Sequence, residues 1–391
     1  MVRDRMRANS DRGKSRQMDR LVRTRGLKWW RLVLPALIAL GPSGALGAAA
    51  CTLDRASGTT IDHAPFLRGG YGIRWNLSTD RLAFMQPDAS GYYRIFAMNP
   101  NQTGRVELGV GLANLPPGHR GMVYWQPSGR YLIFTAQKAA WKDTKMFGVP
   151  AYGALPGFGV HDDMWVIRAD GSQAWQLTDE PNTKRQGVLL PIFSPDGSHV
   201  VWADRQPDKT YSLDIADFVE TPAPHLANIR VLLPGGQHYY EPGSFSSDGR
   251  SLFYTSDRDT HHFWLSQIYR LDFGTGLSTR LTRGLTYNEH PVAIATPGGD
   301  WVVYMSTQGV QRRHLHFALG TDWWAMRPDG LGAKRLTTMN VRNPDNPENL
   351  GAVEVATTVA ISPSGTFMLG DTQDSLVHQT GLDWIVRFTC L

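Results

Sequence analysis

The sequence predicts an all-β fold, a six-bladed β-propeller of four-stranded antiparallel blades whose last blade is closed by an N-terminal strand. Two observations lead to this prediction. Residues 193–202, FSPDGSHVVW, have the pattern of a strand end, a tight turn and a second strand. Variants of this stretch recur along the chain at a spacing typical of propeller blades.

The repeats can be aligned at the glycine of the turn. Clear copies occupy residues 125–134, 245–254 and 361–368, and degenerate copies occupy 75–84 and 296–304. The aligned positions are Thr79, Gly129, Gly197, Gly249, Gly299 and Gly365, so the spacings are 50, 68, 52, 50 and 66 residues. A period of about 50 residues with two longer intervals predicts blades that carry two insertions.

The repeats divide the chain into predicted blades. They cover residues 71–108, 122–178, 188–233, 241–282, 291–337 and 354 onward. The last blade has only three strands in the sequence, and an open sheet edge would expose unpaired backbone groups. We therefore expect a strand within residues 59–67 to pair with the last blade and close the ring. The predicted domains are a leader (1–50), a linker with the closing strand (51–70) and the propeller (71–391).

The first 50 residues have the layout of a secretory signal peptide. Basic residues precede an apolar run at 32–46, and small residues follow it up to Cys51. Glycine and proline interrupt the run, which is too short for a membrane span. Translation starts at Met1 or, in a leader of more usual length, at Met18. The alternative to cleavage is a permanent N-terminal anchor. We expect a periplasmic or secreted protein with no transmembrane span after signal cleavage.

The basic net charge of the chain resides in this leader. Residues 1–50 hold 11 of the 40 Lys and Arg residues and 3 of the 35 Asp and Glu residues. The remainder has 29 basic against 32 acidic residues, a formal charge of about −3. Nucleic acid is therefore excluded as an expected partner.

The two cysteines, Cys51 and Cys390, stand at the two ends of the predicted mature chain. Export would allow a disulfide between them. The alternatives are a lipid anchor on Cys51 and two free thiols. A lipoprotein signal usually has leucine three residues before the cysteine, where this chain has Ala48, so we favour the disulfide.

The order of elements within a repeat resembles that of a known family. Ser-Pro-Asp-Gly at 194–197, Thr-Ser-Asp-Arg at 255–258, Ile-Tyr-Arg-Leu-Asp at 268–272 and Arg-Leu-Thr at 280–282 are similar to the TolB-like propeller repeat, a relative of WD40 repeats. The resemblance covers about residues 71–388. It implies a stand-alone propeller without the N-terminal α/β domain of TolB, and a binding role.

The predicted topology places a site on one face of the propeller. Second-to-third strand connections and links between blades share a face, and they include the long segments 139–162, 259–266, 308–320 and 338–353. Aromatic residues decorate these segments and could stack on a ligand. The ligand-binding residues that we predict at the rim of the central channel are His161, Asp162, His238, Glu241, Glu289, His290 and Glu354. Imidazoles and carboxylates are ligands for a divalent metal, for which His161, His238 and His290 are the candidates, although long polar loops also collect histidines with no such role.

The main functional hypothesis is a binding scaffold that recognises an envelope protein or an envelope glycan on this face. The chain has no Gly-x-Ser-x-Gly elbow, phosphate loop, dinucleotide fingerprint or zinc signature. The alternative comes from the resemblance. Some relatives with this repeat are oligogalacturonate lyases, seven-bladed enzymes that hold a metal at the propeller's centre, and this implies a metal-dependent polysaccharide lyase with a histidine-rich channel.

Overall fold

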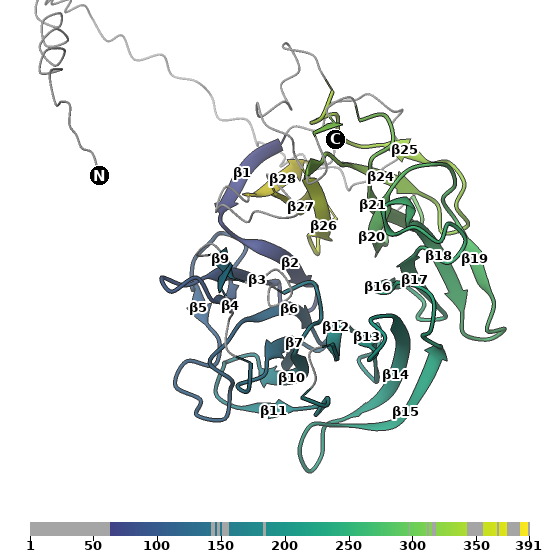
Figure 1. Ribbon diagram of the computed structural model, residues 1–391. Helices are drawn as coiled ribbons and strands as arrows, with labels where there is room; N and C mark the ends of the chain where they lie inside the picture. The colour runs from purple at the N-terminus through teal and green to yellow at the C-terminus, as the bar shows by residue number, and fades with distance from the viewer. Residues whose placement is uncertain are drawn as a thin grey trace, which may run out of the picture. The chain divides into compact units, whose positions relative to one another are not determined.

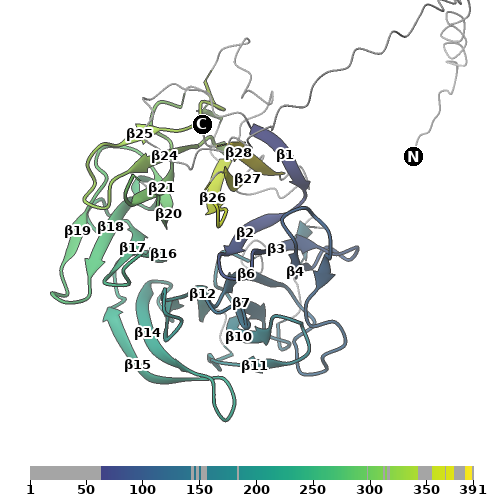
Figure 2. The same cartoon turned by 180° about the vertical axis from the view of Figure 1, so that it is seen from behind.

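The computed structural model describes residues 63–141, 145–146, 149–150, 156–182, 185–296, 298–310, 313–314, 318–341, 355–365, 367–373 and 384–389. These residues belong to one unit of the chain, residues 48–391. They form six four-stranded antiparallel sheets arranged around a centre (Figures 1 and 2).

Each of five sheets is formed by one continuous stretch of chain, in which the strands follow one another from the centre outward. These sheets are β2–β5 (Tyr71–Asn76, Arg81–Pro87, Tyr93–Met98, Val106–Glu107), β6, β7, β10 and β11 (Arg120–Trp125, Tyr131–Gln137, Asp162–Arg168, Ala174–Gln176), β12–β15 (Gly187–Phe193, His199–Arg205, Tyr211–Val219, His225–Leu233), β16–β19 (Tyr240–Phe245, Ser251–Ser256, Gln267–Asp272, Ser278–Arg280) and β20, β21, β24 and β25 (Asn288–Ile294, Trp301–Ser306, Asp322–Met326, Lys334–Arg335). Two short hairpins interrupt the second and fifth of them: β8–β9 (Lys145–Met146, Val149–Pro150) and β22–β23 (Arg313–His314, Ala318–Leu319).

The remaining sheet is composite. It joins β26 (Val355–Ile361), β27 (Phe367–Gln373) and β28 (Trp384–Thr389) to β1 (His63–Arg68), which pairs antiparallel with β28. The prediction of six blades is therefore wrong. Only five blades are complete four-stranded units of continuous chain, and the last sheet exists only because two distant segments pair. The reason is that β28 is followed by no further strand among the described residues, so its free edge is covered by β1.

The repeated turn motif owes its shape to side-chain hydrogen bonds. In the turn before β13, Ser194 Oγ donates to Asp196 Oδ1 at 2.6 Å and accepts from the His199 amide at 2.9 Å. Gly197 has a φ of +74°, a conformation that glycine adopts at little cost. The turn before β17 repeats the arrangement with Ser246, Asp248 and Gly249. The hydrogen bond from Ser194 Oγ, followed by that from the backbone amide of Ser198, lowers the pKa of Asp196 to about 2.

The ring is closed by packing of the innermost strands. Each of β2, β6, β12, β16, β20 and β26 contacts the next, and β26 contacts β2. Apolar side chains fill the spaces between neighbouring sheets; Leu132, Phe134 and Ile167 are fully buried there. Three tryptophans of the strands, Trp165, Trp202 and Trp323, are also buried. No helix among the described residues has the length and apolar character needed to span a membrane.

A buried carboxylate reinforces the closure. Asp371 of β27 accepts hydrogen bonds from the backbone amides of Gly72 and Ile73 in β2, both at 3.0 Å, and from Thr357 Oγ1 at 2.9 Å. It thereby links the composite sheet to the first continuous blade. Burial raises the pKa of Asp371, while Arg74 and these donors lower it.

Candidate functional site

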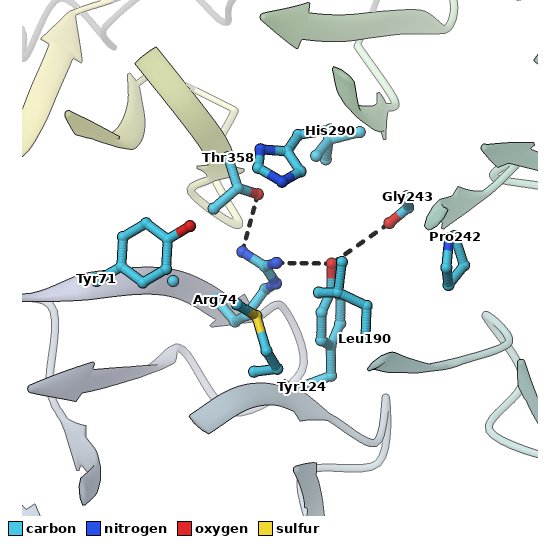
Figure 3. A pocket seen from close by; sticks show the side chains of 11 residues that line it. Tyr71, Arg74, Tyr124, Leu190, Pro242, Gly243, His290 and Thr358 are labelled. Carbon is cyan, nitrogen blue, oxygen red and sulfur yellow. Dashed lines mark hydrogen bonds between the residues drawn. The ribbon is translucent and has the colours of Figure 1, made fainter. Parts of the chain in front are cut away.

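Each innermost strand is interrupted by a β-bulge near its middle. Register shifts occur in all six strand pairs that involve an innermost strand. At four of the bulges a residue has positive φ: Gly72, Met122, Leu190 and His290. A bulge of this kind redirects a side chain, and all four residues line the same small cavity in the centre (Figure 3). Histidine is costlier than glycine in this conformation, which makes His290 a candidate for a functional role.

Three of the predicted rim residues come together at the bulge of β20. Glu241 of β16 and Glu289 and His290 of β20 offer oxygen or nitrogen atoms that all lie within 4.8 Å of one another. His290 Nε2 is 3.0 Å from Glu241 Oε1 and 3.9 Å from Glu289 Oε2. The strands bring them together because β16 and β20 are neighbouring innermost strands. We call these three residues the acidic triad.

Burial shifts the protonation of the acidic triad. It raises the pKa of Glu241 to about 8. Burial and then the charge of Glu241 raise the pKa of Glu289 to about 8, although His290 acts in the opposite direction. Burial also lowers the pKa of His290. At neutral pH the triad therefore combines protonated carboxyl groups with a neutral imidazole.

The acidic triad lies at the inner end of a pocket of ≈ 430 Å³. Its walls come from second-to-third strand connections (156–158, Lys209–Thr210 and Asp257–Trp264) and from links between blades (237–239 and Tyr287). These segments share the face on which the sequence predicted a site. The volume is within the usual range for a small-molecule or side-chain pocket.

Aromatic rings form a continuous wall of this pocket. Tyr211 contacts Tyr239 at 5.3 Å between ring centroids, and Tyr239 contacts Phe263 at 5.0 Å. Tyr287 completes the wall at 5.7 Å from both Phe263 and Trp264. Phe263 and Trp264 remain 38% and 40% exposed, so part of the wall is open to solvent. We call these five residues the aromatic wall.

An arginine, Arg74, lines the small central cavity together with His290 (Figure 3). Arg74 of β2 donates to Thr358 Oγ1 at 2.8 Å and to the Tyr124 hydroxyl at 2.7 Å, and its guanidinium lies 4.0 Å from the centroid of the Tyr124 ring. Tyr124 in turn donates to the carbonyl of Gly243 at 3.3 Å. Arg74 thus ties three sheets together across the channel.

The other predicted site residues do not join the acidic triad. His238 lines the pocket, with Nδ1 3.9 Å from Asp257 Oδ1. His161 instead stacks on Trp141 with ring centroids 3.9 Å apart. Asp162 is buried next to it, and burial raises its pKa well above the usual range. Neither is among the residues that line the pocket. Glu354, Cys51 and Cys390 lie outside the described residues.

Sequence reasoning missed Arg74, Tyr124 and Asp371. A charged residue at an otherwise apolar position of a predicted innermost strand would have been the signal for Arg74. Asp371 had no comparable signal, because its partners are backbone amides about 300 positions away in the chain.

The donor set allows two kinds of chemistry. Two carboxylates and an imidazole are suitable ligands for a divalent metal ion. The predicted set of three histidines is not assembled among the described residues, because His161 is held by Trp141 away from the pocket. The same carboxyl groups, surrounded by aromatic rings, could instead receive an organic cation.

Comparison with known proteins gives few close matches. No family model matches the chain. An uncharacterized protein of Agrobacterium fabrum is 30% identical over 105 residues, which is 27% of this chain and 29% of that protein. Similar solved structures include a candidate TolB from Agrobacterium tumefaciens (TM-score 0.48, 15% identity, 83% of this chain and 91% of that chain). TolB from Acinetobacter baumannii (0.48, 15%, 82% and 63%) and a puromycin-hydrolyzing peptidase of Mycobacterium tuberculosis (0.44, 12%, 85% and 56%) are also similar.

Proposed function

We propose that this protein is an exported binding propeller, located in the periplasm, that recognises a segment of a partner protein in the pocket of its long-connection face. The observation that carries the proposal is the position of the pocket. Most of the residues that line it belong to connections, which a rigid ring of strands holds in place, and connections on such a scaffold are the usual place for recognition.

The composition of the pocket favours a protein segment as its ligand. Tyrosine and tryptophan are enriched in protein-binding surfaces because they provide large contact areas at low cost in conformational entropy. Trp264 and Phe263 are the exposed members of the aromatic wall, and the acidic triad supplies a polar anchor below them. An anchor of this type receives one side chain or one chain terminus of the partner.

The lyase alternative has less support. It requires several histidines around one metal, whereas the clustered donors among the described residues are two glutamates and one histidine.

Site-specific photo-crosslinking in the periplasm tests the proposed function. A photoreactive phenylalanine analogue in place of Trp264 should capture one partner protein as a discrete adduct. The matched control is the same replacement at Leu331, which is 69% exposed in the β24–β25 turn on the opposite face. An adduct at position 331 but none at 264 would contradict the assignment of the binding face.

A further inference from the structure

We propose that the pocket binds its ligand through an ammonium group, which lies against Glu241 and Glu289 and is enclosed by the aromatic wall. This inference rests on the proposed function and names the chemistry of the anchored group. A lysine side chain and a free chain N-terminus both carry this group.

The acidic triad offers two ionisable carboxyl groups to a cation, which would stabilise their charged forms. The carboxyl groups of Glu241 and Glu289 are the two acids at the inner end of the pocket. Arg74, whose charge acts on Glu241, His290 and Asp371, donates hydrogen bonds to the hydroxyl groups of Thr358 and Tyr124. The titratable and charged groups around the triad come from every neighbouring element. They are Tyr71 and Arg74 of β2, Tyr124 of β6, Tyr211 of β14, Asp371 of β27, Tyr239 and His238 before β16, Tyr287 before β20, Asp257 after β17 and, in the exposed β13–β14 connection, Lys209.

One atom of the acidic triad has no hydrogen-bond partner. Nδ1 of His290 is buried and unpaired, whereas Nε2 of the same ring lies 3.0 Å from Glu241 Oε1. The other carboxyl oxygen of Glu241 accepts a hydrogen bond from the Tyr239 hydroxyl. Unsatisfied buried acceptors are costly, and such atoms in a pocket are suited to a donor that arrives with the ligand. A primary ammonium group brings up to three donors and a positive charge, and a quaternary ammonium group such as that of choline brings the positive charge alone.

The aromatic wall is the second independent observation. Faces of tyrosine and tryptophan attract ammonium and methylated ammonium groups, and an aromatic cage next to a carboxylate is the common arrangement for binding them. Here the rings of Tyr239, Phe263 and Tyr287 form a connected series beside the acidic triad, and Trp264 extends it to the solvent. A hydrated metal ion is bound by oxygen or nitrogen ligands and gains little from contact with aromatic rings.

Binding of an ammonium group is coupled to the release of protons. Without a cation the carboxyl pair retains protons at pH 7, because the pKa of each group is about 8. A bound cation favours the ionised forms, so protons pass from the carboxyl groups to the buffer. Affinity should therefore rise with pH between about 6 and 8, and the rise should level off above pH 8.

Calorimetric titration of the full mature chain with matched probes tests this inference. Choline is compared with its neutral isostere 3,3-dimethyl-1-butanol. We expect choline to bind at least tenfold more tightly and to release protons at pH 7, measured from the difference between two buffers of unequal ionisation enthalpy. Glu241→Gln and Glu289→Gln should each reduce choline affinity at least tenfold and diminish the proton release. The control Glu220→Gln changes a carboxylate on the opposite face and should leave both unchanged.

Two further pairs of probes distinguish the sources of the ammonium group. Nα-acetyl-lysine amide is compared with its Nε-acetylated form, and phenylalanine amide with its N-acetylated form. Preference for the first free amine indicates a lysine side chain, and preference for the second indicates a chain N-terminus; either result supports the inference.

Equal affinity for charged and neutral probes would overturn the inference. So would binding of manganese(II) at one equivalent, dependent on Glu241 and His290, in a protein that binds none of the amines. The proposed function fails separately. If crosslinking at position 264 captures a partner while no amine binds, only the anchor chemistry is wrong. If amines bind while crosslinking captures nothing, the proposal that the ligand is part of a protein is wrong.

Discussion

Two buried acidic sites lie at the centre of this propeller, and their surroundings differ. Asp371 has three donors within 3.0 Å, two of them backbone amides that cannot move away. Glu241 and Glu289 instead share their site with His290, whose Nε2 lies 3.0 Å from Glu241 Oε1 and whose Nδ1 is buried without a partner. A carboxylate held by two backbone amides serves the fold, whereas a buried cluster with an unsatisfied polar atom has capacity for a ligand.

Removal of Asp371 should have the largest effect on stability. Asp371→Ala leaves two buried amides of β2 without acceptors and removes the charge that faces Arg74. We expect the free energy of unfolding to fall by about 4 kcal/mol, as measured by urea denaturation. Thr357→Val removes only one donor to the same carboxylate and should cost about 1 kcal/mol. A loss below 1 kcal/mol for Asp371→Ala would show that this carboxylate does not close the ring.

The acidic triad should make stability depend on pH in the opposite way from an ordinary ion pair. The pKa values of Glu241 and Glu289 are raised to about 8 in the folded protein, so the folded state holds protons that the unfolded chain loses at lower pH. The free energy of unfolding should therefore decrease, by about 2 to 4 kcal/mol, as the pH rises from 5 to 8. Urea titrations across this range measure it.

The variant Glu241→Gln isolates this contribution. Glutamine cannot ionise, so the decrease between pH 5 and 8 should become shallower, and the variant should gain stability relative to the native chain at pH 8. An unchanged slope would place the two carboxyl groups in a more hydrated environment than the structure does.

Loss of one ring from the aromatic wall should affect binding more than folding. Trp264 is 40% exposed, so Trp264→Ala removes little of the core. We expect choline affinity to decrease about tenfold, equivalent to about 1.4 kcal/mol. Leu331→Ala, a truncation of an exposed side chain on the opposite face, is the control and should bind choline as the native chain does.

The smallest effect on stability is expected for His290→Leu. Leu190 occupies the equivalent bulge of β12 with a φ of 49°, close to the 53° of His290, so leucine is compatible with this backbone. The free energy of unfolding at pH 7 should change by less than about 1 kcal/mol. Because the pKa of His290 is lowered, protonation of the unfolded chain destabilises the native protein below about pH 6.5. The leucine variant should lose this acid-side effect in urea titrations at pH 5 and 7.

The sequence revealed the elements that are encoded locally. The Ser-x-Asp-Gly turns predicted the hairpins because each turn is stabilised by its own side chains, as at Ser194 and Asp196. The strand that closes the ring, His63–Arg68, could be placed because an open edge requires a partner, and the pairing with β28 is observed. Glu241, Glu289 and His290 could be assigned to the channel because they stand at the start of innermost strands.

Contacts between segments far apart in the sequence could not be predicted in this way. The stacking of His161 on Trp141 depends on the conformation of a long insertion, which no local pattern determines. The hydrogen bonds of Asp371 and Arg74 depend on which strands meet across the ring. The number of blades was predicted incorrectly for the same reason, because the composite sheet is formed by a pairing between distant segments.

The Asp371 contact with β2 also constrains the order of events during synthesis. The chain leaves the ribosome with Gly72 and Ile73 far ahead of Asp371, and β1 ahead of β28. The nascent protein must therefore hold two unpaired strand edges for nearly the whole time that it is being made. Exposed edges of this kind readily pair with those of other chains, so this period is when aggregation is the greatest hazard and when a chaperone would have the most to protect.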